Sequence, residues 1–407
     1  MKEFNYDQIC EMLIGSTFLA GGAGGSLEAG LKLFENLKEE TLKLYEIGDL
    51  EDTPETSAEY ASILAVMGSP SELEEHDFAS ILSNTILQMR KRCTACSTYK
   101  KITHVIPFAY GGVSTAIPAY LALTNDEFKL ADADGSGRAV PSLDTALVSL
   151  NGAPITPFVM ANETNDSMCI DLANDTDAAQ CQIVSHSLRT TSPLFTSVNG
   201  AAGWPIKSSE LKTYANPNSL TYAQKLGACI SQYIKAKGEK TNTSVFDYLN
   251  AHMEDFKGCA LGDNTKGSFT TLAKAGKRKL QNGKEFGVIQ IYTKCPDDNI
   301  QWEIRFINES MVIFQNSKSA LDAPVITAPS VITIFDETDN IPLTNDYILA
   351  HIEELKDHKV TLGVMPAPAK WWENREVKDM TEIWRKSYDE IDYRGFCLRY
   401  DNIEGRL

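Results

Sequence analysis

Long apolar runs are absent from this sequence. Apolar stretches such as Ile63–Met67 and Val105–Ala109 fall far short of the roughly 20 residues that a helix needs to cross a bilayer. The first residues, MKEFNYDQICEMLIGS, place acidic side chains before any apolar segment and offer no small-residue cleavage site, which argues against a secretory signal. We therefore expect a cytoplasmic protein that does not associate with membranes.

Basic residues are fewer than acidic residues in this sequence. Lysine and arginine number 38 against 55 aspartates and glutamates, which gives a formal charge of −17. This charge repels a phosphate backbone, and no basic run with interleaved aromatic residues offsets it. The composition therefore argues against nucleic acid as a partner, and we expect a small-molecule substrate.

Cysteine and histidine are few and scattered. The nine cysteines are odd in number and spread along the chain, so a disulfide framework is not expected. Cys93 and Cys96 form a lone CxxC next to Arg90, Lys91 and Arg92, which leaves open either a reactive thiol or two ordinary cysteines near a helix end. The six histidines form no HxH, HxxxH or HExxH pattern, and no Gly-x-Ser-x-Gly elbow is present, which excludes the common hydrolase signatures.

Two patterns of predicted secondary structure follow one another along the 407-residue chain. Up to about residue 165, helical segments alternate with short apolar runs such as Thr103–Phe108 and Lys129–Ala133, which predicts an α/β layer structure. The polar, acid-rich segment Thr164–Ala179 is expected to be a linker or an exposed loop. Ser219–Lys237 is the clearest later helix, which Gly238 would end. After residue 255, short β-rich runs separated by turn residues predict a sandwich- or barrel-like module.

A glycine-rich segment, Leu19–Gly25 (LAGGAGG), lies between the predicted helix Tyr6–Ile14 and a second helix with Ser26 as its N-cap. Glycines allow positive φ and let backbone N–H groups point at a ligand, and a helix N-terminus favours anionic or carbonyl oxygens. The segment is not a P-loop, and Leu27 stands where the dinucleotide fingerprint needs a third glycine. Two interpretations stay open, a ligand-binding loop and a tight turn between helices.

The segment Ala131–Pro141 (ADADGSGRAVP) begins like a calcium-binding EF-hand loop. Counted from Asp132, the twelfth position of such a loop is Leu143, so the bidentate glutamate is missing and calcium binding is not favoured. As a loop after a strand, the segment would present Asp132, Asp134 and Arg138 to a crevice, since ligand crevices form at strand ends in α/β sheets. A solvated turn, with Arg138 paired to an aspartate, is the alternative.

Three further side chains are candidates for a general base. His104 lies in a predicted buried strand, His186 is followed by Arg189, and Glu309 comes after Asn308 at the end of a strand. An imidazole or a carboxylate in such a place can activate a water or position a substrate. Structural histidines and an ordinary polar turn are the alternatives.

Several segments share motifs with one protein family over about residues 8 to 400. Phe18–Gly25 is similar to its glycine-rich loop, and Leu130–Pro141 is similar to its Asp-x-Asp…Gly-Arg-Ala…Pro stretch, the most specific of the matches. Further matching segments are Ile106–Val113, Ile307–Glu309, Ala328–Asp336 and Val364–Trp372. On these segments the chain resembles the S-methyl-thiohydantoin desulfurase family, formerly known by its association with hydantoinase and oxoprolinase genes. Ala20, Ala23 and Ser330 depart from the pattern, which indicates a divergent member.

The resemblance implies two domains and an activity. An α/β N-terminal domain with a Gly-rich loop is expected over residues 1–167, and a β-rich, sandwich- or barrel-like C-terminal domain with a few helices over residues 168–407. The implied protein is a hydrolase-like enzyme that replaces a sulfur substituent of a hydantoin- or thiohydantoin-type ring with oxygen. The alternative is a non-catalytic subunit or binding partner of a hydantoinase- or oxoprolinase-type enzyme, and a homo-oligomer is also open.

The resemblance also suggests a site. The predicted substrate-binding residues are Gly21, Gly22, Gly24, Gly25, Gly111, Gly112 and Asn308. Asp132 or Asp134 would orient or deprotonate a water, and Arg138 would hold an oxygen anion. The other candidates for the base are His104, His186 and Glu309. The sequence identifies no cofactor; if a divalent metal takes part, these aspartates and histidines are its expected ligands.

Overall fold

The computed structural model describes most of the chain. The described residues are 1–50, 58–68, 76–95, 100–195, 198–237, 243–261, 270–279, 285–293, 301–316, 323–356 and 358–403. No helix in this part of the chain is long and apolar enough to cross a membrane.

An eight-stranded mixed sheet organises the first half of the chain, in the order β1-β2-β5-β4-β3-β9-β7-β8. Its strands are β1 (Lys2–Phe4), β2 (Leu42–Tyr45), β3 (Glu59–Met67), β4 (Lys101–Pro107), β5 (Lys129–Ala131), β7 (Phe158–Ala161), β8 (Ser167–Ile170) and β9 (Asn199–Lys207). β2, β5, β4 and β3 are parallel, so their carboxyl ends lie along one edge. The predicted strand Thr103–Phe108 is confirmed as β4. The predicted strand Lys129–Ala133 is interrupted at Asp132, after which β6 (Ala133–Asp134) pairs with β10 (Asn216–Pro217).

Helices surround this sheet, and some of them begin at a residue whose side chain caps the helix. The helices are α1 (Tyr6–Leu19), α2 (Leu27–Lys32), α3 (Phe78–Ala95), α4 (Gly112–Thr124), α5 (Leu147–Leu150), α6 (Ala178–Thr191), α7 (Leu211–Tyr214), α8 (Ser219–Lys237) and α9 (Val245–His252). Asn5 and Gln8 form a capping box at the start of α1. The Ser26 hydroxyl accepts a hydrogen bond from Ala29 N at 3.2 Å, which confirms Ser26 as the N-cap of α2.

Two sequence predictions reach beyond the described residues. Gly238, the expected stop of α8, lies outside them, although the helix itself is confirmed. Of the CxxC pair, Cys93 is buried in α3 and Cys96 lies outside the described residues. The choice between a reactive thiol and two ordinary cysteines therefore stays open.

The acidic segment Thr164–Ala179 is a connection within the mixed sheet and its helices rather than a linker. It holds the end of the β7–β8 hairpin, strand β8 and the start of α6, with exposed loop residues between them. Strand β9 then pairs with both β7 and β3. The mixed sheet therefore extends past residue 167, as far as Lys207.

β-Strands dominate the second half, as predicted, and the structure shows that they are antiparallel. One sheet has the order β12-β13-β14-β15-β16 and the other β11-β19-β17-β18. The strands are β11 (Cys259–Leu261), β12 (Thr270–Lys279), β13 (Glu285–Thr293), β14 (Gln301–Ile307), β15 (Glu309–Asn316), β16 (Ala323–Thr327), β17 (Val331–Asp336), β18 (Ile341–Leu343) and β19 (Val360–Met365), and the helices are α10 (Asn345–Ala350), α11 (Ile352–Leu355) and α12 (Val377–Glu390). The two sheets share one apolar core, to which Ile304 and Ile313 contribute from the first and Ile332 and Leu362 from the second.

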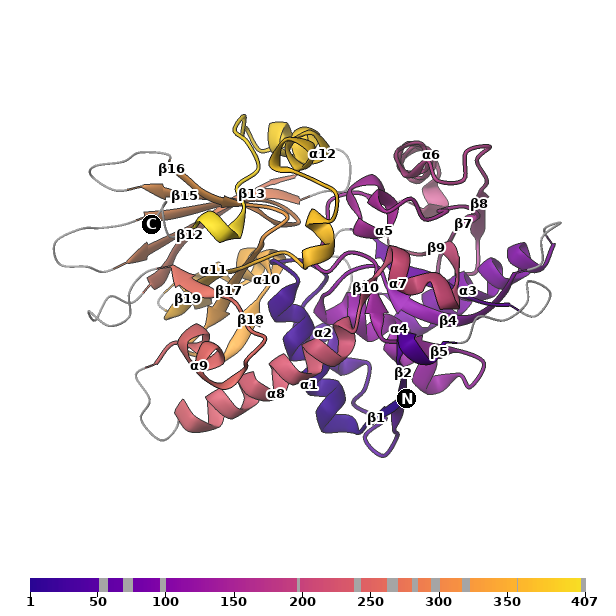
Figure 1. Ribbon diagram of the computed structural model, residues 1–407, viewed down its shortest axis with the longest axis horizontal. Helices are drawn as coiled ribbons and strands as arrows, with labels where there is room; N and C mark the ends of the chain where they lie inside the picture. Colours follow the sequence, from indigo (N-terminus) through magenta and orange to yellow (C-terminus); the bar gives the residue numbers. More distant parts are fainter. Residues whose placement is uncertain are drawn as a thin grey trace.

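Helix α1 lies between the two halves. Figure 1 shows it in the middle of the molecule, with the mixed sheet on one side and the C-terminal strands on the other. The ring of Phe18, near its end, lies 5.3 Å from that of Phe246 in α9 and 6.2 Å from that of Phe335 in β17. The glycine-rich segment that follows α1 therefore begins where the two halves meet.

Candidate active site

A groove opens at the carboxyl ends of the parallel strands β3 and β4. It consists of two adjoining cavities of about 140 and 270 Å³. Both cavities are lined by Val66, Gly68, Phe108, Val140 and Asn308. Ligand crevices of open α/β sheets form at this edge, where the loops that follow the strands converge. We call it the strand-end groove.

The glycine loop lines one end of the strand-end groove with Ala23, Gly24 and Gly25. Within the described part of the chain, no group accepts a hydrogen bond from the backbone N–H of these three residues. The carbonyl of Gly24, by contrast, accepts from Val113 N at 3.0 Å and from Ser114 N at 2.9 Å. The Gly24 carbonyl thus bonds to the protein, whereas the three N–H groups remain as donors at the groove. Such donors can bind an oxygen atom that carries negative charge.

Gly111 and Gly112 support the glycine loop and do not line the groove. Gly112 N donates to Gly25 O at 3.2 Å. A Cβ on Gly111 would lie 2.5 Å from Gly24 Cα, and one on Gly24 would lie 2.6 Å from Tyr110 O. The two segments can approach this closely only because both are glycine.

Gly21 and Gly22 face the C-terminal half of the protein. Gly21 O accepts a hydrogen bond from Ser310 N, and Gly22 O accepts one from Asn345 N, each at 2.7 Å. These bonds join the loop to β15 and α10. Of the four loop glycines predicted to bind substrate, Gly24 and Gly25 therefore line the groove, whereas Gly21 and Gly22 fix the loop.

Asn308 and Glu309 reach the groove from the turn between β14 and β15. Asn308 adopts φ +56°, and its Oδ1 accepts a hydrogen bond from Glu285 N at 2.8 Å. Its Nδ2 donates to no described residue and is therefore available to a ligand. Glu309 is buried, with 1% of its surface exposed, and lines the same cavity as the glycine loop. An amide, a carboxylate and three backbone donors thus surround one small cavity.

The other end of the groove carries basic side chains. His186, half-buried on α6, lines it as the sequence suggested, together with Arg189 of the same helix. Lys386 and Glu390 of α12 line it as well. Sequence reasoning missed these two residues, because a Lys and a Glu four positions apart are an ordinary feature of an exposed helix face.

Asp132 lies outside the groove and caps helix α8. The side chain is fully buried. Its Oδ1 accepts from Leu220 N and Thr221 N, both at 3.0 Å, and its Oδ2 accepts from Thr221 Oγ1 at 2.5 Å. An acidic side chain that satisfies free N–H groups at a helix start has the role of an N-cap.

Asp134 closes the turn that follows β6. Its Oδ1 accepts hydrogen bonds from Ser136 N at 2.8 Å and from Gly137 N, and its Oδ2 accepts one from Asn216 Nδ2 at 2.8 Å. Burial raises the pKa of the Asp134 carboxyl to about 6 in spite of these donors. Asp132 and Asp134 direct their carboxylates at different partners, so the calcium loop is not formed, and neither lines the groove.

Arg138 is buried where the two halves meet. Its guanidinium donates to three backbone carbonyls, those of Ala139 at 2.9 Å, Ser310 at 2.8 Å and Ser330 at 2.6 Å. Burial lowers the pKa of Arg138 to about 10, and the negative charge of Glu309 opposes this shift. The sequence left open an aspartate as the partner of Arg138, but the partners in the structure are backbone carbonyls, two of them in the C-terminal half. Arg138 also does not line the groove.

His104 is buried within β4, away from the groove. Its Nδ1 lies 2.9 Å from Ser208 Oγ and 3.0 Å from Thr103 Oγ1, and its Nε2 has no hydrogen-bond partner among the described residues. Burial lowers the pKa of His104 to about 4, so the ring is neutral at pH 7. His104 is therefore a buried structural histidine that Thr103 and Ser208 hold in place.

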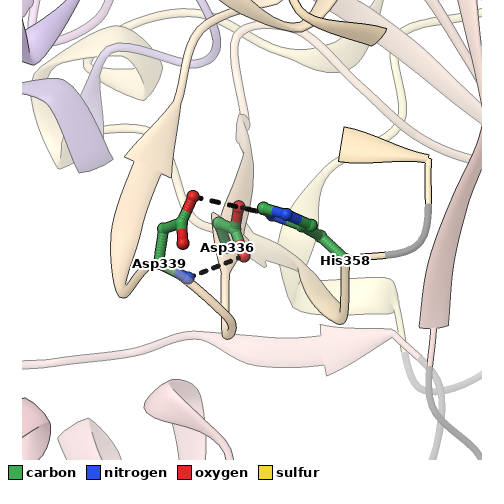
Figure 2. A group of neighbouring side chains, drawn as sticks. All are labelled: Asp336, Asp339 and His358. Carbon is green, nitrogen blue, oxygen red and sulfur yellow. Dashed lines mark hydrogen bonds and ion pairs between the residues drawn. The ribbon is translucent and has the colours of Figure 1, made fainter. Parts of the chain in front are cut away.

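One group of metal-ligating side chains lies at the turn after β17. Figure 2 shows Asp336, Asp339 and His358 with their polar ends together, and their ligand atoms lie within 4.8 Å of one another. His358 Nδ1 is 2.7 Å from Asp336 Oδ2, and Asp336 Oδ1 accepts from Thr338 N at 2.7 Å. These bonds explain the group without a metal, as a turn that the pair of His358 and Asp336 closes. None of the predicted metal ligands belongs to this group, and a divalent metal stays a prediction.

Comparison with known proteins gives a family and a shared fold. One family model, S-Me-THD-like, N-terminal domain, matches residues 7–172, and a second, S-Me-THD-like, C-terminal domain, matches residues 179–380. No curated protein matches the sequence. The crystal structure of a Chromobacterium violaceum protein, a structural genomics target, superposes with a TM-score of 0.77 at 21% identity over 98% of this chain and 100% of that one, which shows that the fold is shared. Because the two models together match most of its length, the chain belongs to the S-Me-THD-like, or S-methyl-thiohydantoin desulfurase-like, family.

Proposed function

We propose that the protein is a hydrolase that replaces a sulfur substituent of a hydantoin-type ring with oxygen in the strand-end groove. One observation carries the proposal: three loop N–H groups without a partner in the described structure share a cavity with the Asn308 amide and the Glu309 carboxylate. Such donors stabilise charge that develops on a ring oxygen or nitrogen, and such a carboxylate takes a proton from water. Membership of the family supports the substrate class.

In the proposed reaction, water attacks the ring carbon that carries the S-methyl group. The new C–O bond forms as Glu309 takes one proton from the water, and the electrons of the ring C=N bond move onto the nitrogen, near the donors of the loop and of Asn308. The C–S bond then breaks, the remaining proton of the water passes from the new oxygen to the ring nitrogen, and the thiolate receives the proton from Glu309. The products are the hydantoin carbonyl and methanethiol, so atoms and charge balance without an oxidant or a reductant.

The test is release of thiol from S-methyl-thiohydantoin by the purified protein, followed with a thiol-reactive dye. Glu309→Gln keeps the shape of the side chain but cannot take a proton, so we expect kcat to fall by about 100-fold or more. Glu382→Gln, on the exposed face of α12, is the matched control and should leave kcat unchanged. Wild-type turnover by Glu309→Gln would remove Glu309 from the mechanism.

The non-catalytic alternative predicts a different pattern. A ring compound at about 100 times its dissociation constant would stabilise the protein by about 2.7 kcal/mol, visible as a raised melting temperature, but no thiol would appear. That result would identify a binding partner for another enzyme instead of a hydrolase. Repeating the assay after treatment with a chelator tests the divalent metal, since loss of turnover that returns with added metal would establish one.

A further inference from the structure

A second cavity, of about 620 Å³, opens between the two halves of the protein, and we call it the seam cleft. Leu19, Tyr110 and Ser219 line it from the first half, and Met365 and Trp372 line it from the second. It is more than twice as large as either part of the strand-end groove. Its size and its position between two structural units are typical of sites for small organic ligands.

The walls of the seam cleft offer aromatic surface. Tyr110 is buried, and Tyr222 and Trp372 are half-buried along the cleft. One face of the Trp372 ring is covered by the Arg399 guanidinium at 4.4 Å, and Arg399 pairs with Asp401 at 2.7 Å. The charge of Arg399 is therefore already balanced, and the walls favour a flat ring over a strongly charged group.

The floor of the seam cleft carries a buried polar atom. Ser219 is 2% exposed, and its hydroxyl stabilises the charged form of the Asp134 carboxyl, which lowers the pKa of Asp134 against the effect of burial. Ser219 thus joins the floor of the seam cleft to the buried turn that Asp134 closes.

The rim supplies two opposite charges. Asp255 and Lys257 are exposed, lie two positions apart and line the cleft, and neither takes part in an ion pair among the described residues. Burial, together with the charge of Asp255, raises the pKa of Tyr222 to about 12, so Asp255 lies near the aromatic wall. A ligand that carries an ammonium and a carboxylate group on one carbon matches this pair of charges.

We infer that the seam cleft binds a zwitterionic aromatic amino acid. The ring lies against the aromatic walls, the ammonium group meets Asp255 and the carboxylate meets Lys257. This inference is independent of the proposed hydrolase. The cleft and the groove share a wall, since Gly137 lines the first and Ala139 and Val140 line the second. Its occupant therefore contacts the same chain segment that borders the groove.

The test is calorimetric titration of the full chain with L-tryptophan, tryptamine and indole-3-propionate. We expect one site for L-tryptophan, and about fivefold weaker binding of each analogue, because each has lost one charge partner. Lys257→Glu should weaken L-tryptophan by about tenfold and should not weaken tryptamine, since tryptamine has no carboxylate and its ammonium group gains a negative neighbour. Asp255→Asn should weaken L-tryptophan and leave indole-3-propionate unchanged.

Glu309→Gln separates the seam cleft from the strand-end groove. It should leave the affinity for L-tryptophan as in the wild type, whatever its effect on thiol release. The inference is overturned if L-tryptophan gives no heat at millimolar concentration, if neither rim variant alters its affinity, or if Glu309→Gln abolishes its binding. Equal affinity for all three indoles would overturn the assignment to a zwitterion.

Discussion

Between Asp132 and Arg138 the chain buries three ionisable side chains, each with its own set of partners. Asp132 accepts hydrogen bonds at the start of α8, Asp134 accepts them within a turn, and Arg138 donates to three carbonyls. A charge without partners would cost several kcal/mol in the protein interior, so each is retained only with these bonds. Their combined effect is to hold Ala139 and Val140, which border the strand-end groove.

Two of the buried groups should make opposite contributions to stability between about pH 4 and 6. The pKa of Asp134 rises on folding from 3.8 to about 6, so its contribution is complete below pH 3.8 and is lost as the pH rises to 6. The pKa of His104 falls on folding from 6.5 to about 4, so its contribution is complete above pH 6.5 and is lost as the pH falls to 4. Each effect amounts to about 3 kcal/mol and offsets the other in the wild type.

Urea denaturation at several pH values measures this balance. The unfolding free energy of His104→Asn minus that of the wild type should rise by about 3 kcal/mol as the pH falls from 6.5 to 4, because only the wild type loses the contribution of His104. Asp134→Asn should gain about the same amount, relative to the wild type, as the pH rises from 4 to 6. Differences from the wild type that stay constant with pH would show that neither group changes its pKa on folding.

At the scale of elements, the glycine loop and the start of α4 form one unit. The backbone of the loop turns through four glycines with positive φ, and its carbonyls accept bonds from the first residues of α4 and from β15. A donor-rich loop of this kind needs a rigid support, because free N–H groups bind a charged oxygen well only when they are held in place. The contact between Gly24 and Gly111 provides that support.

Gly24→Ala should destabilise this unit by about 2 to 4 kcal/mol. The alanine would have positive φ, and its Cβ would lie 2.6 Å from Tyr110 O. Gly152 also has positive φ, +81°, but open space around its Cβ position, so Gly152→Ala should cost only about 1 kcal/mol. Thermal melts of both variants separate backbone strain from steric overlap, and equal melting temperatures would show that the close contact is not present.

Asp132→Ala should destabilise the protein by about 2 kcal/mol or more, because the start of α8 would lose its buried cap. Asp177 caps the more exposed start of α6, accepting from Gln180 N at 2.9 Å, and serves as the control. Asp177→Ala should cost about 1 kcal/mol. A wild-type melting temperature for Asp132→Ala, together with loss of turnover, would instead support the catalytic role first considered for Asp132.

At the scale of the whole molecule, the two halves are joined by α1 and by Arg138. The aromatic contacts of Phe18 reach across to β17, and Arg138 binds carbonyls at the start of β15 and just before β17. The strand-end groove takes residues from both halves, since Gly24 belongs to one and Glu309 to the other. The geometry of the groove therefore depends on this junction.

Arg138→Met should lower the unfolding free energy by about 3 to 5 kcal/mol, because the Ser310 and Ser330 carbonyls would be left buried without a donor. Arg90, which is paired with Glu127 at the surface, gives a matched control. Arg90→Met should cost less than about 1 kcal/mol, since exposed ion pairs contribute little. Equal urea midpoints for the two variants would refute the junction role of Arg138.

Much of the local structure was predictable. The Ser26 cap, the strand at Thr103–Phe108 and the β-rich character of the C-terminal half follow from patterns within short segments, and all three are confirmed. The strand β8 within the polar segment Thr164–Ala179 was not predictable, because this strand is defined by its pairing with β7 and not by a buried apolar run of its own.

The positions of the backbone turns and of the apolar strands follow from short stretches of sequence, because glycine conformation, capping and hydrophobic runs act over a few residues. The grouping of polar side chains into a site depends instead on how distant segments pack. Asp132 accepts hydrogen bonds from the start of α8, and Arg138 donates to carbonyls of β15 and of Ser330. Glu309 and Lys386 are distant in sequence from the glycine loop and from His186, yet they line the same groove. Side-chain direction is set by the packing of the two halves, and no short pattern encodes that packing.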